Sequence, residues 1–181
     1  MVFKGSRSTS GDAPVRPPQP GGIAVRVFTA DYVLGGYVPP PGQAFLGWLN
    51  NVNQRAIVLT QVQAVGLAPD NVVPAFSVAE VTLPKNRIIA VDLMDDAGRR
   101  TIQLAPRRVP AAVYAGDLVI RADLRPPGEM PVANLFNVMS ADFFSVSEAR
   151  IHSAVPSHDF GPVESQILLI NQRWVDFYHA L

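Results

Sequence analysis

Apolar and polar residues alternate in two short segments that follow a Pro- and Gly-rich start. The segments 23–28 and 32–38 are rich in β-branched and aromatic residues, and they flank the turn Thr29-Ala30-Asp31. This is the pattern of a β-hairpin. Segments 56–65, 78–83 and 87–93 also have strand character. We therefore predict five strands in the first half of the chain.

One short helix is predicted between the second and third strands. The run Pro40-Pro41-Gly42 cannot continue a strand, and after it apolar residues recur at helical spacing from Phe45 to Val52. Asn51 falls at the predicted end of this helix, where an Asn can adopt the left-handed conformation that terminates a helix. We predict that Leu49 and Val52 lie in the core.

The same pattern recurs 86 residues later. A second hairpin surrounds Ala115-Gly116-Asp117, a second helix covers Val132 to Val138, and strands are predicted at 143–151, 165–170 and 173–178. Matching residues include the pairs Val27 and Val113, Asp31 and Asp117, Val33 and Val119, Pro40-Pro41-Gly42 and Pro126-Pro127-Gly128, Leu49 and Leu135, Asn51 and Asn137, Val52 and Val138, and, after a one-residue slip in a loop, Leu83 and Leu169, Arg87 and Arg173. We predict a tandem duplication, in which Leu135 and Val138 lie in the core and Asn137 ends the second helix in the left-handed conformation.

The elements predict a mainly β fold in which each copy is a small bent β-barrel. About five strands and one short helix per copy suit a barrel better than a sandwich, which needs more strands. Gly35-Gly36 would permit a sharp bend in the second strand, whereas the second copy has Arg121-Ala122 there. The predicted parts are a disordered Pro- and Gly-rich tail at 1–22, β module one at 23–98, a basic linker or extra strand at 99–108, and β module two at 109–181.

The first module resembles a family of short bacterial β-barrel domains that has no assigned activity. The resemblance rests on Arg26-Val27-Phe28-Thr29, Tyr32, Gly35 or Gly36, Phe45-Leu46-Gly47-Trp48-Leu49-Asn50 and Val58-Leu59-Thr60-Gln61-Val62. The second module matches more weakly, through Asn134-Leu135-Phe136-Asn137 and Val146-Ser147-Glu148-Ala149. The family has no known catalytic residues, so the resemblance implies architecture alone.

Composition narrows the class of protein. The 181 residues are 48% hydrophobic, hold 15 basic and 15 acidic side chains, and include no cysteine. Neither disulfides nor thiolate metal sites are therefore expected. No segment approaches the roughly 20 apolar residues of a membrane helix, and residues 1–22 lack the apolar run of a signal peptide. We expect a soluble, cytoplasmic bacterial protein without membrane insertion.

Charge is distributed unevenly along the chain. Residues 1–22 sum to +2, module one to −2, the linker to +4 and module two to −4. The linker charges are Arg99, Arg100, Arg107 and Arg108. They either complement the acidic modules within the chain or contact an acidic partner. Without interleaved aromatic residues, nucleic acid is an unlikely partner. Trp48, whose counterpart is Asn134, is a second candidate contact with a partner or between the modules.

Motifs of catalysis and ligand binding are weak. His152 and His158, with Asp159, lie in a polar loop without a third metal ligand, and Asp95-Asp96 precedes a turn. Arg121 and Arg125 have the spacing of one cyclic-dinucleotide element, but the second element is missing. The chain contains neither a Gly-x-Ser-x-Gly elbow nor a phosphate-binding loop.

These patterns predict a noncatalytic interaction or scaffold protein that acts through protein–protein contacts. It would be a homo-oligomer or a subunit of a larger assembly, with no catalytic, cofactor-binding or metal-binding residues, no cofactor and no identified small-molecule substrate. The alternative is a small-ligand-sensing β-barrel module of bacterial signalling. A sensor should present convergent polar groups in a pocket, whereas a scaffold should expose apolar edge strands or a helix face.

Overall fold

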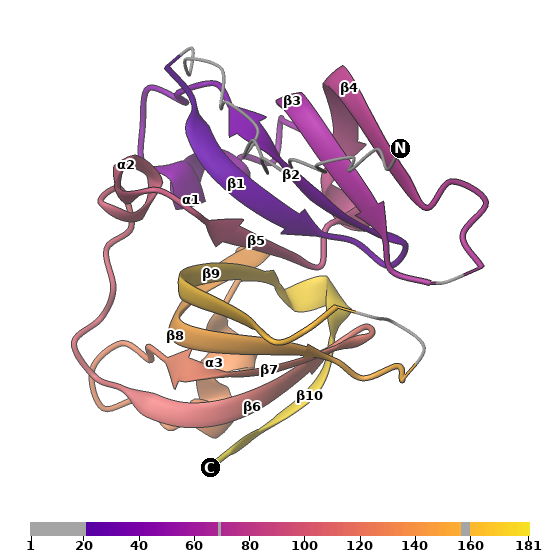
Figure 1. The fold of residues 1–181 in the computed structure, drawn as a ribbon. Helices are drawn as coiled ribbons and strands as arrows, with labels where there is room; N and C mark the ends of the chain where they lie inside the picture. The colour runs from indigo at the N-terminus through magenta and orange to yellow at the C-terminus, as the bar shows by residue number, and fades with distance from the viewer. Residues whose placement is uncertain (1–20, 69, 157–159) are drawn as a thin grey trace, which may run out of the picture.

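A computed structural model describes residues 21–68, 70–156 and 160–181, so the predicted tail lies outside the described residues except for Gly21 and Gly22. The described residues form ten strands and several short helices, whose arrangement is drawn in Figure 1. In chain order they are β1 (Ile23–Phe28), β2 (Tyr32–Val38), α1 (Phe45–Leu49), β3 (Ala56–Gly66), β4 (Ala75–Pro84), the 3₁₀ turn η1 (Lys85–Arg87), β5 (Ala90–Leu93), α2 (Asp96–Arg99), β6 (Val109–Ala115), β7 (Leu118–Leu124), α3 (Val132–Val138), β8 (Phe143–Ser153), β9 (Val163–Asn171), the 3₁₀ turn η2 (Gln172–Trp174) and β10 (Val175–Ala180).

All ten strands belong to one open antiparallel sheet, in the order β10-β6-β7-β8-β9-β5-β1-β2-β3-β4. The mainly β prediction is confirmed, but the predicted closure of each half into a barrel is wrong. A barrel in the first half would need β4 to pair with β5. Instead β5 pairs with β9 of the second half, through Ala90 with Ile170, Val91 with Leu169 and Asp92 with Leu168. We call this pairing the seam. It leaves β4 and β10 at the two edges of the sheet.

The two halves of the chain have the same order of elements. Each runs through two strands, a helix, two strands, a 3₁₀ turn and a last strand, and the neighbour orders β5-β1-β2-β3-β4 and β10-β6-β7-β8-β9 are equivalent. Figure 1 shows the first half above the second, with β5 and β9 between them. The seam therefore joins the last strand of the first half to the fourth strand of the second.

The strand registers correct two of the sequence matches. Strands β2 and β7 occupy equivalent positions at a spacing of 86 residues. Strands β3 and β8 do so at 87, because their left-handed residues, Gln61 and Glu148, are 87 apart. Strands β4 and β9 then also match at 87, because Leu83 faces Ile57 as Ile170 faces Phe144. The one-residue slip persists beyond the loop. Leu83 thus corresponds to Ile170 instead of Leu169, and Arg87 to Trp174 instead of Arg173.

Each of the two hydrophobic clusters contains residues from both halves of the chain, which meet at the seam. The first contains the interior of β1 to β5 and also Phe143, Ile167 and Leu169 from the second half. The second contains the interior of β6 to β10 and also Phe28 and Ile89 from the first half. Apolar residues alternate onto both faces of β9, so each half completes the core of the other.

The helix predictions are confirmed for the leucines and wrong for the valines. Leu49 and Leu135 are buried, whereas Val52 is 86% exposed and Val138 is 60% exposed. Helix α1 ends at Leu49, before Val52 could return to its buried face, and Val138 is the last residue of α3. The predicted left-handed Asn51 and Asn137 are also wrong, because the described residues other than Gly with positive φ are Gln61 and Glu148.

A bulge bends the sheet at the same place in each half. The register of β2 with β3 shifts after Gly35, and that of β7 with β8 shifts after Arg121. The extra residues are Gln61 and Glu148, each with a φ of 52°. Left-handed backbone costs a residue other than Gly about 1–2 kcal/mol. The bend predicted at Gly35-Gly36 is thus accompanied by a bulge on the neighbouring strand, and in the second half it forms without glycine.

The basic segment 99–108 begins at the end of α2 and leads to β6. Residues 99–108 contain no strand, so the extra strand predicted as one of the two alternatives for this segment is wrong. The side chain of Asp95 accepts a hydrogen bond from the backbone N–H of Gly98 at 2.8 Å and thereby caps a short helix. The chain turns away at this point and connects the two halves.

Candidate functional site

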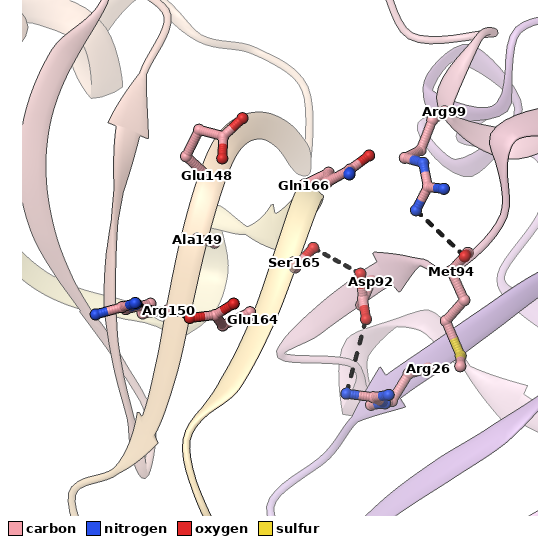
Figure 2. Close-up of a pocket in the computed structure, with 10 residues that line it drawn as sticks. All are labelled: Arg26, Asp92, Met94, Arg99, Glu148, Ala149, Arg150, Glu164, Ser165 and Gln166. Carbon is pink, nitrogen blue, oxygen red and sulfur yellow. Dashed lines mark hydrogen bonds and ion pairs between the residues drawn. The ribbon is translucent and has the colours of Figure 1, made fainter.

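A polar cavity of about 630 Å³ lies beside the seam. Its lining comes from β1 and β5, with the segment that follows β5, and from β8 and β9 (Figure 2). The lining includes three guanidinium groups and three carboxyl groups, those of Arg26, Arg99, Arg150, Asp92, Glu148 and Glu164. Both signs of charge therefore meet where the two halves join.

Asp92 is the most deeply buried charged group of this cavity. It stands alone among apolar residues of β5, and its side chain is 6% exposed. Its Oδ1 accepts a hydrogen bond from the Ser165 hydroxyl at 2.6 Å, while Oδ2 lies 3.9 Å from Nη1 of Arg26. Oδ2 accepts no hydrogen bond from the described residues. Burial raises the pKa of Asp92 above its ordinary value, and Ser165 and the two nearby arginines oppose that rise.

The three arginines of the cavity differ in how fully their donors are used. Arg99 donates to the carbonyl oxygens of Leu93 and Met94 and to Oδ1 of Asp96. Arg150 donates to Glu164 at 2.8 and 3.1 Å. The Arg26 side chain, in contrast, makes no hydrogen bond within the described part of the chain, and its one ionic contact there is with Asp92. Its guanidinium retains free donors on the cavity side.

Glu148 is placed in the cavity by the bulge of β8. Its left-handed backbone is uncommon for a residue with a side chain, and such conformations persist where the surrounding structure determines them. The Glu148 side chain is exposed and has no ionic or hydrogen-bonded partner among residues 21–68, 70–156 and 160–181. The cavity thus combines a free donor group, Arg26, with free acceptors on Asp92 and Glu148.

A shallower hollow of about 290 Å³ occupies the corresponding place on the first half. It is lined by Gln61, Val62, Gln63, Ser77, Val78 and Ala79, which correspond at a spacing of 87 to the six residues that β8 and β9 contribute to the seam cavity. Here the neighbouring strand β4 is the edge of the sheet. Among the described residues, no further strand covers this side.

The edge strand β4 is long and exposed. Seven of its ten residues are exposed, and the run from Ala75 to Ala79 carries no charge. Val78, in the middle of the strand, is 42% exposed. The other edge strand, β10, is shorter and carries Asp176 and His179. Edge strands with unpaired backbone groups can accept another strand, and charged side chains discourage this. Of the two edges, β4 is the less protected.

A second cavity, of about 560 Å³, is lined by a buried lysine whose ammonium group bonds backbone carbonyl oxygens of this chain. Lys85 Nζ donates to the carbonyl oxygens of Leu49 at 2.6 Å and Asn51 at 2.8 Å. Burial lowers the pKa of Lys85, and the charge of Asp142 partly opposes this. These bonds satisfy carbonyls at the end of α1, which is a structural use of the lysine.

The linker arginines predicted as partner contacts are placed mainly against their own chain. Arg99 bonds the end of β5, Arg107 Nη1 donates to the carbonyl of Met130 at 2.7 Å, and Arg108 lies 3.8 Å from Asp123. Arg100 is exposed and has no ionic partner within the described part of the chain. Of the two readings of the linker charge, these contacts favour complementarity within the chain.

The other residues singled out in the sequence do not converge on a site. Trp48 is half-buried against the first cluster, with its ring 5.3 Å from that of Phe45. His152 lies in β8, whereas His158 and Asp159 lie outside the described residues. Arg121 is exposed, and Arg125 bonds Ser147 and the carbonyl of Ala105. The described residues contain no group of three or more His, Asp or Glu side chains placed to hold a metal ion.

Sequence reasoning missed Arg26, Asp92 and Ser165. One signal was present, because Asp92 is the only charged residue in the run Ile88 to Leu93. A lone charge in a buried strand needs a partner, but the partner comes from a strand more than 70 residues away. The contact between Asp92 and Ser165 becomes evident only from the pairing of β5 with β9.

Comparisons of the chain with family models, curated proteins and solved structures find no match. The resemblance of the first module to bacterial barrel domains therefore stays a prediction. In the described part of the chain, no helix has both the length and the apolar character needed to cross a membrane.

Proposed function

We propose that this chain is a noncatalytic interaction protein that associates through the open edge of β4. The observation that carries the proposal is the edge itself, ten residues long, largely exposed and uncharged from Ala75 to Ala79. Backbone groups on such an edge can pair with a strand of another molecule. In the other half, the corresponding edge of β9 is occupied by β5 of this same chain.

The partner we propose for β4 is the β4 strand of a second copy. In an antiparallel pair centred on Val78, the single charge of the strand, Glu80, faces Phe76 of the other copy, so the two Glu80 carboxylates do not oppose each other. The two exposed Val78 side chains meet at the centre. Pairing through one edge of each copy gives a closed dimer.

Sedimentation velocity over a concentration series tests this proposal. Val78→Lys places a charge at the centre of the edge, and we expect it to remove the dimer that the wild type forms. Val52→Lys is the matched control, because Val52 is more exposed and lies outside the sheet. A wild type that stays monomeric at the highest concentration, or two variants that associate equally well, would contradict the proposal. High salt should leave the dimer intact, since the proposed contact uses no ion pair.

We also propose that the chain arose by tandem duplication of one module. The support is the shared element order, the shared strand order and the pair of bulges at Gln61 and Glu148. An experimentally determined structure should let the backbones of 23–93 and 109–180 superpose once the one-residue slip is included. Different strand orders in the two halves would refute the duplication.

The second candidate function is binding of a small polar ligand in the seam cavity. The specific observation in its favour is Asp92, a buried carboxyl group whose Oδ2 has no hydrogen bond among the described residues although it faces a cavity. A buried acceptor without a donor costs free energy that a ligand would recover. Ligand-detected NMR with a panel of polyols, carboxylates and amines tests this function. Binding that Asp92→Asn weakens supports it, and the absence of any Asp92-dependent binding excludes it.

A further inference from the structure

The seam cavity has three charged groups with unused hydrogen-bonding capacity. They are the guanidinium of Arg26, Oδ2 of Asp92 and the carboxylate of Glu148, as far as the described residues show. The remaining charged groups are already engaged, Arg99 with backbone carbonyls and Asp96, and Arg150 with Glu164. A ligand that fits must therefore offer an acceptor to Arg26 and donors to the two carboxyl groups.

The positions of these groups set the shape of the ligand. Arg26 and Asp92 are neighbours on β1 and β5, with Nη1 and Oδ2 only 3.9 Å apart. Glu148 is on β8, and β9 lies between β8 and β5. Adjacent strands are about 4.8 Å apart, so Glu148 stands on a strand roughly 10 Å from that of Asp92. Figure 2 shows Glu148 and Arg26 on opposite sides of the cavity.

We propose that the seam cavity binds an α-amino acid with a basic side chain. The α-carboxylate accepts hydrogen bonds from Arg26, whose planar fork matches a carboxylate. The α-ammonium, bonded to the same carbon, donates to Oδ2 of Asp92. The side chain extends across the cavity, and its terminal cation reaches Glu148. This inference rests on the second candidate function above and names its ligand class.

The charge pattern disfavours other ligand classes. A dianion would meet the carboxyl groups of Asp92 and Glu148, and a simple cation would lie next to Arg26. An amino acid with a neutral side chain would leave Glu148 without a partner. A lysine-like ligand brings one anionic and two cationic groups to one free cation and two free carboxylates, so the net charge of the three protein groups is balanced.

Calorimetric titration of the full chain with L-lysine tests the proposal, with three analogues that each lack one group. Norleucine lacks the side-chain cation, cadaverine lacks the carboxylate, and Nα-acetyl-lysine lacks the α-ammonium. We expect each to bind about tenfold more weakly than lysine or worse, because each loses at least one charge-assisted hydrogen bond. An analogue that binds as tightly as lysine would overturn the role assigned to the missing group.

Lysine binding by substituted proteins tests which residue contacts each group of the ligand. Asp92→Asn, which keeps an acceptor for Ser165, and Arg26→Lys, which keeps the charge but loses the fork, should each weaken lysine binding about tenfold or more. Glu148→Gln should abolish the preference for lysine over norleucine and leave norleucine binding unchanged. Asp176→Asn, a substitution of an exposed carboxyl on β10, is the control and should bind lysine like the wild type.

Two outcomes separate this inference from the function on which it rests. If lysine does not bind at millimolar concentration while a polyol or carboxylate binds in an Asp92-dependent way, the amino-acid assignment is wrong and the ligand-binding function stands. If no probe binds, both are wrong. Thermal unfolding curves of each variant establish that the compared proteins are folded.

Discussion

At the scale of single residues, Asp92 is the side chain whose surroundings differ most from those of an ordinary surface carboxyl group. It is buried within β5, accepts one hydrogen bond from Ser165 and lies near Arg26. Burial raises its pKa, so the folded state binds a proton more readily than the unfolded chain does. The pH dependence of stability should record this difference.

Asp92→Asn isolates that contribution. The stability associated with protonated Asp92 is fully present below the ordinary carboxyl pKa of 3.8 and is lost as pH rises through the raised folded-state pKa. Asn does not titrate and still accepts from Ser165. We therefore expect the free energy of unfolding of the variant, relative to wild type, to increase from acidic to neutral pH in urea titrations. A difference that does not change with pH would show that Asp92 has the same pKa in both states.

Leu49 and Leu135 anchor the two helices in the two hydrophobic clusters. Truncation of either to Ala removes buried methyl groups and leaves a cavity, so each should lose about 2–5 kcal/mol of unfolding free energy in denaturant titrations. Val52→Ala is the control, and its effect should stay within about 0.5 kcal/mol because Val52 is exposed. Near-zero losses for both leucines would show that the helices do not pack as described.

At the scale of elements, two hydrogen bonds of Asn50, the residue that follows α1, connect this helix to the second half of the chain. The Asn50 side chain donates to the carbonyl of Phe143 at 2.9 Å and accepts from its N–H at 2.8 Å, at the start of β8. Both bonded groups belong to a residue that is 1% exposed. The helix therefore positions β8, and through it one side of the seam.

Asn50→Ala should destabilise the protein by about 1–3 kcal/mol, because it leaves a buried backbone donor and acceptor unsatisfied. Chemical denaturation measures the loss. Asn134→Ala, on the exposed part of α3, offers a matched comparison and should be neutral or slightly stabilising, since Ala favours a helix. Equal effects of the two substitutions would argue against the tie between α1 and β8.

The strands and helices were largely predictable, and their assembly was not. The bounds of β1 and β2 follow from alternation, and both helices follow the Pro-Pro-Gly runs. Val52 fits the helical spacing but lies beyond the end of α1, because periodicity alone does not locate a helix terminus. The barrel prediction failed because local pattern cannot show that β5 prefers β9 to β4. The seam cavity was missed for the same reason, since Asp92 and Ser165 meet only through that pairing.

At the scale of the whole molecule, the seam and the free edges are related. The fourth strand of the second half, β9, has apolar Ile167 and Leu169 on the face that enters the first cluster. At the corresponding positions β4 has Glu80 and Thr82, both exposed. If β4 packed against another molecule as β9 packs against β5 and the first cluster, Glu80 and Thr82 would be buried. Strand β4 is therefore suited to edge-to-edge extension of the sheet and not to a second contact like the seam.

Hydrogen exchange of the β4 backbone tests the association through this edge most directly. We predict that the amides of Ala75 to Glu80 exchange more slowly at high protein concentration than at low concentration, because a partner strand protects them, while amides of β10 exchange at the same rate at both. Val78→Lys should remove the concentration dependence. Exchange of β4 amides that is independent of concentration, in a protein that sediments as a dimer, would contradict the account and move the contact elsewhere.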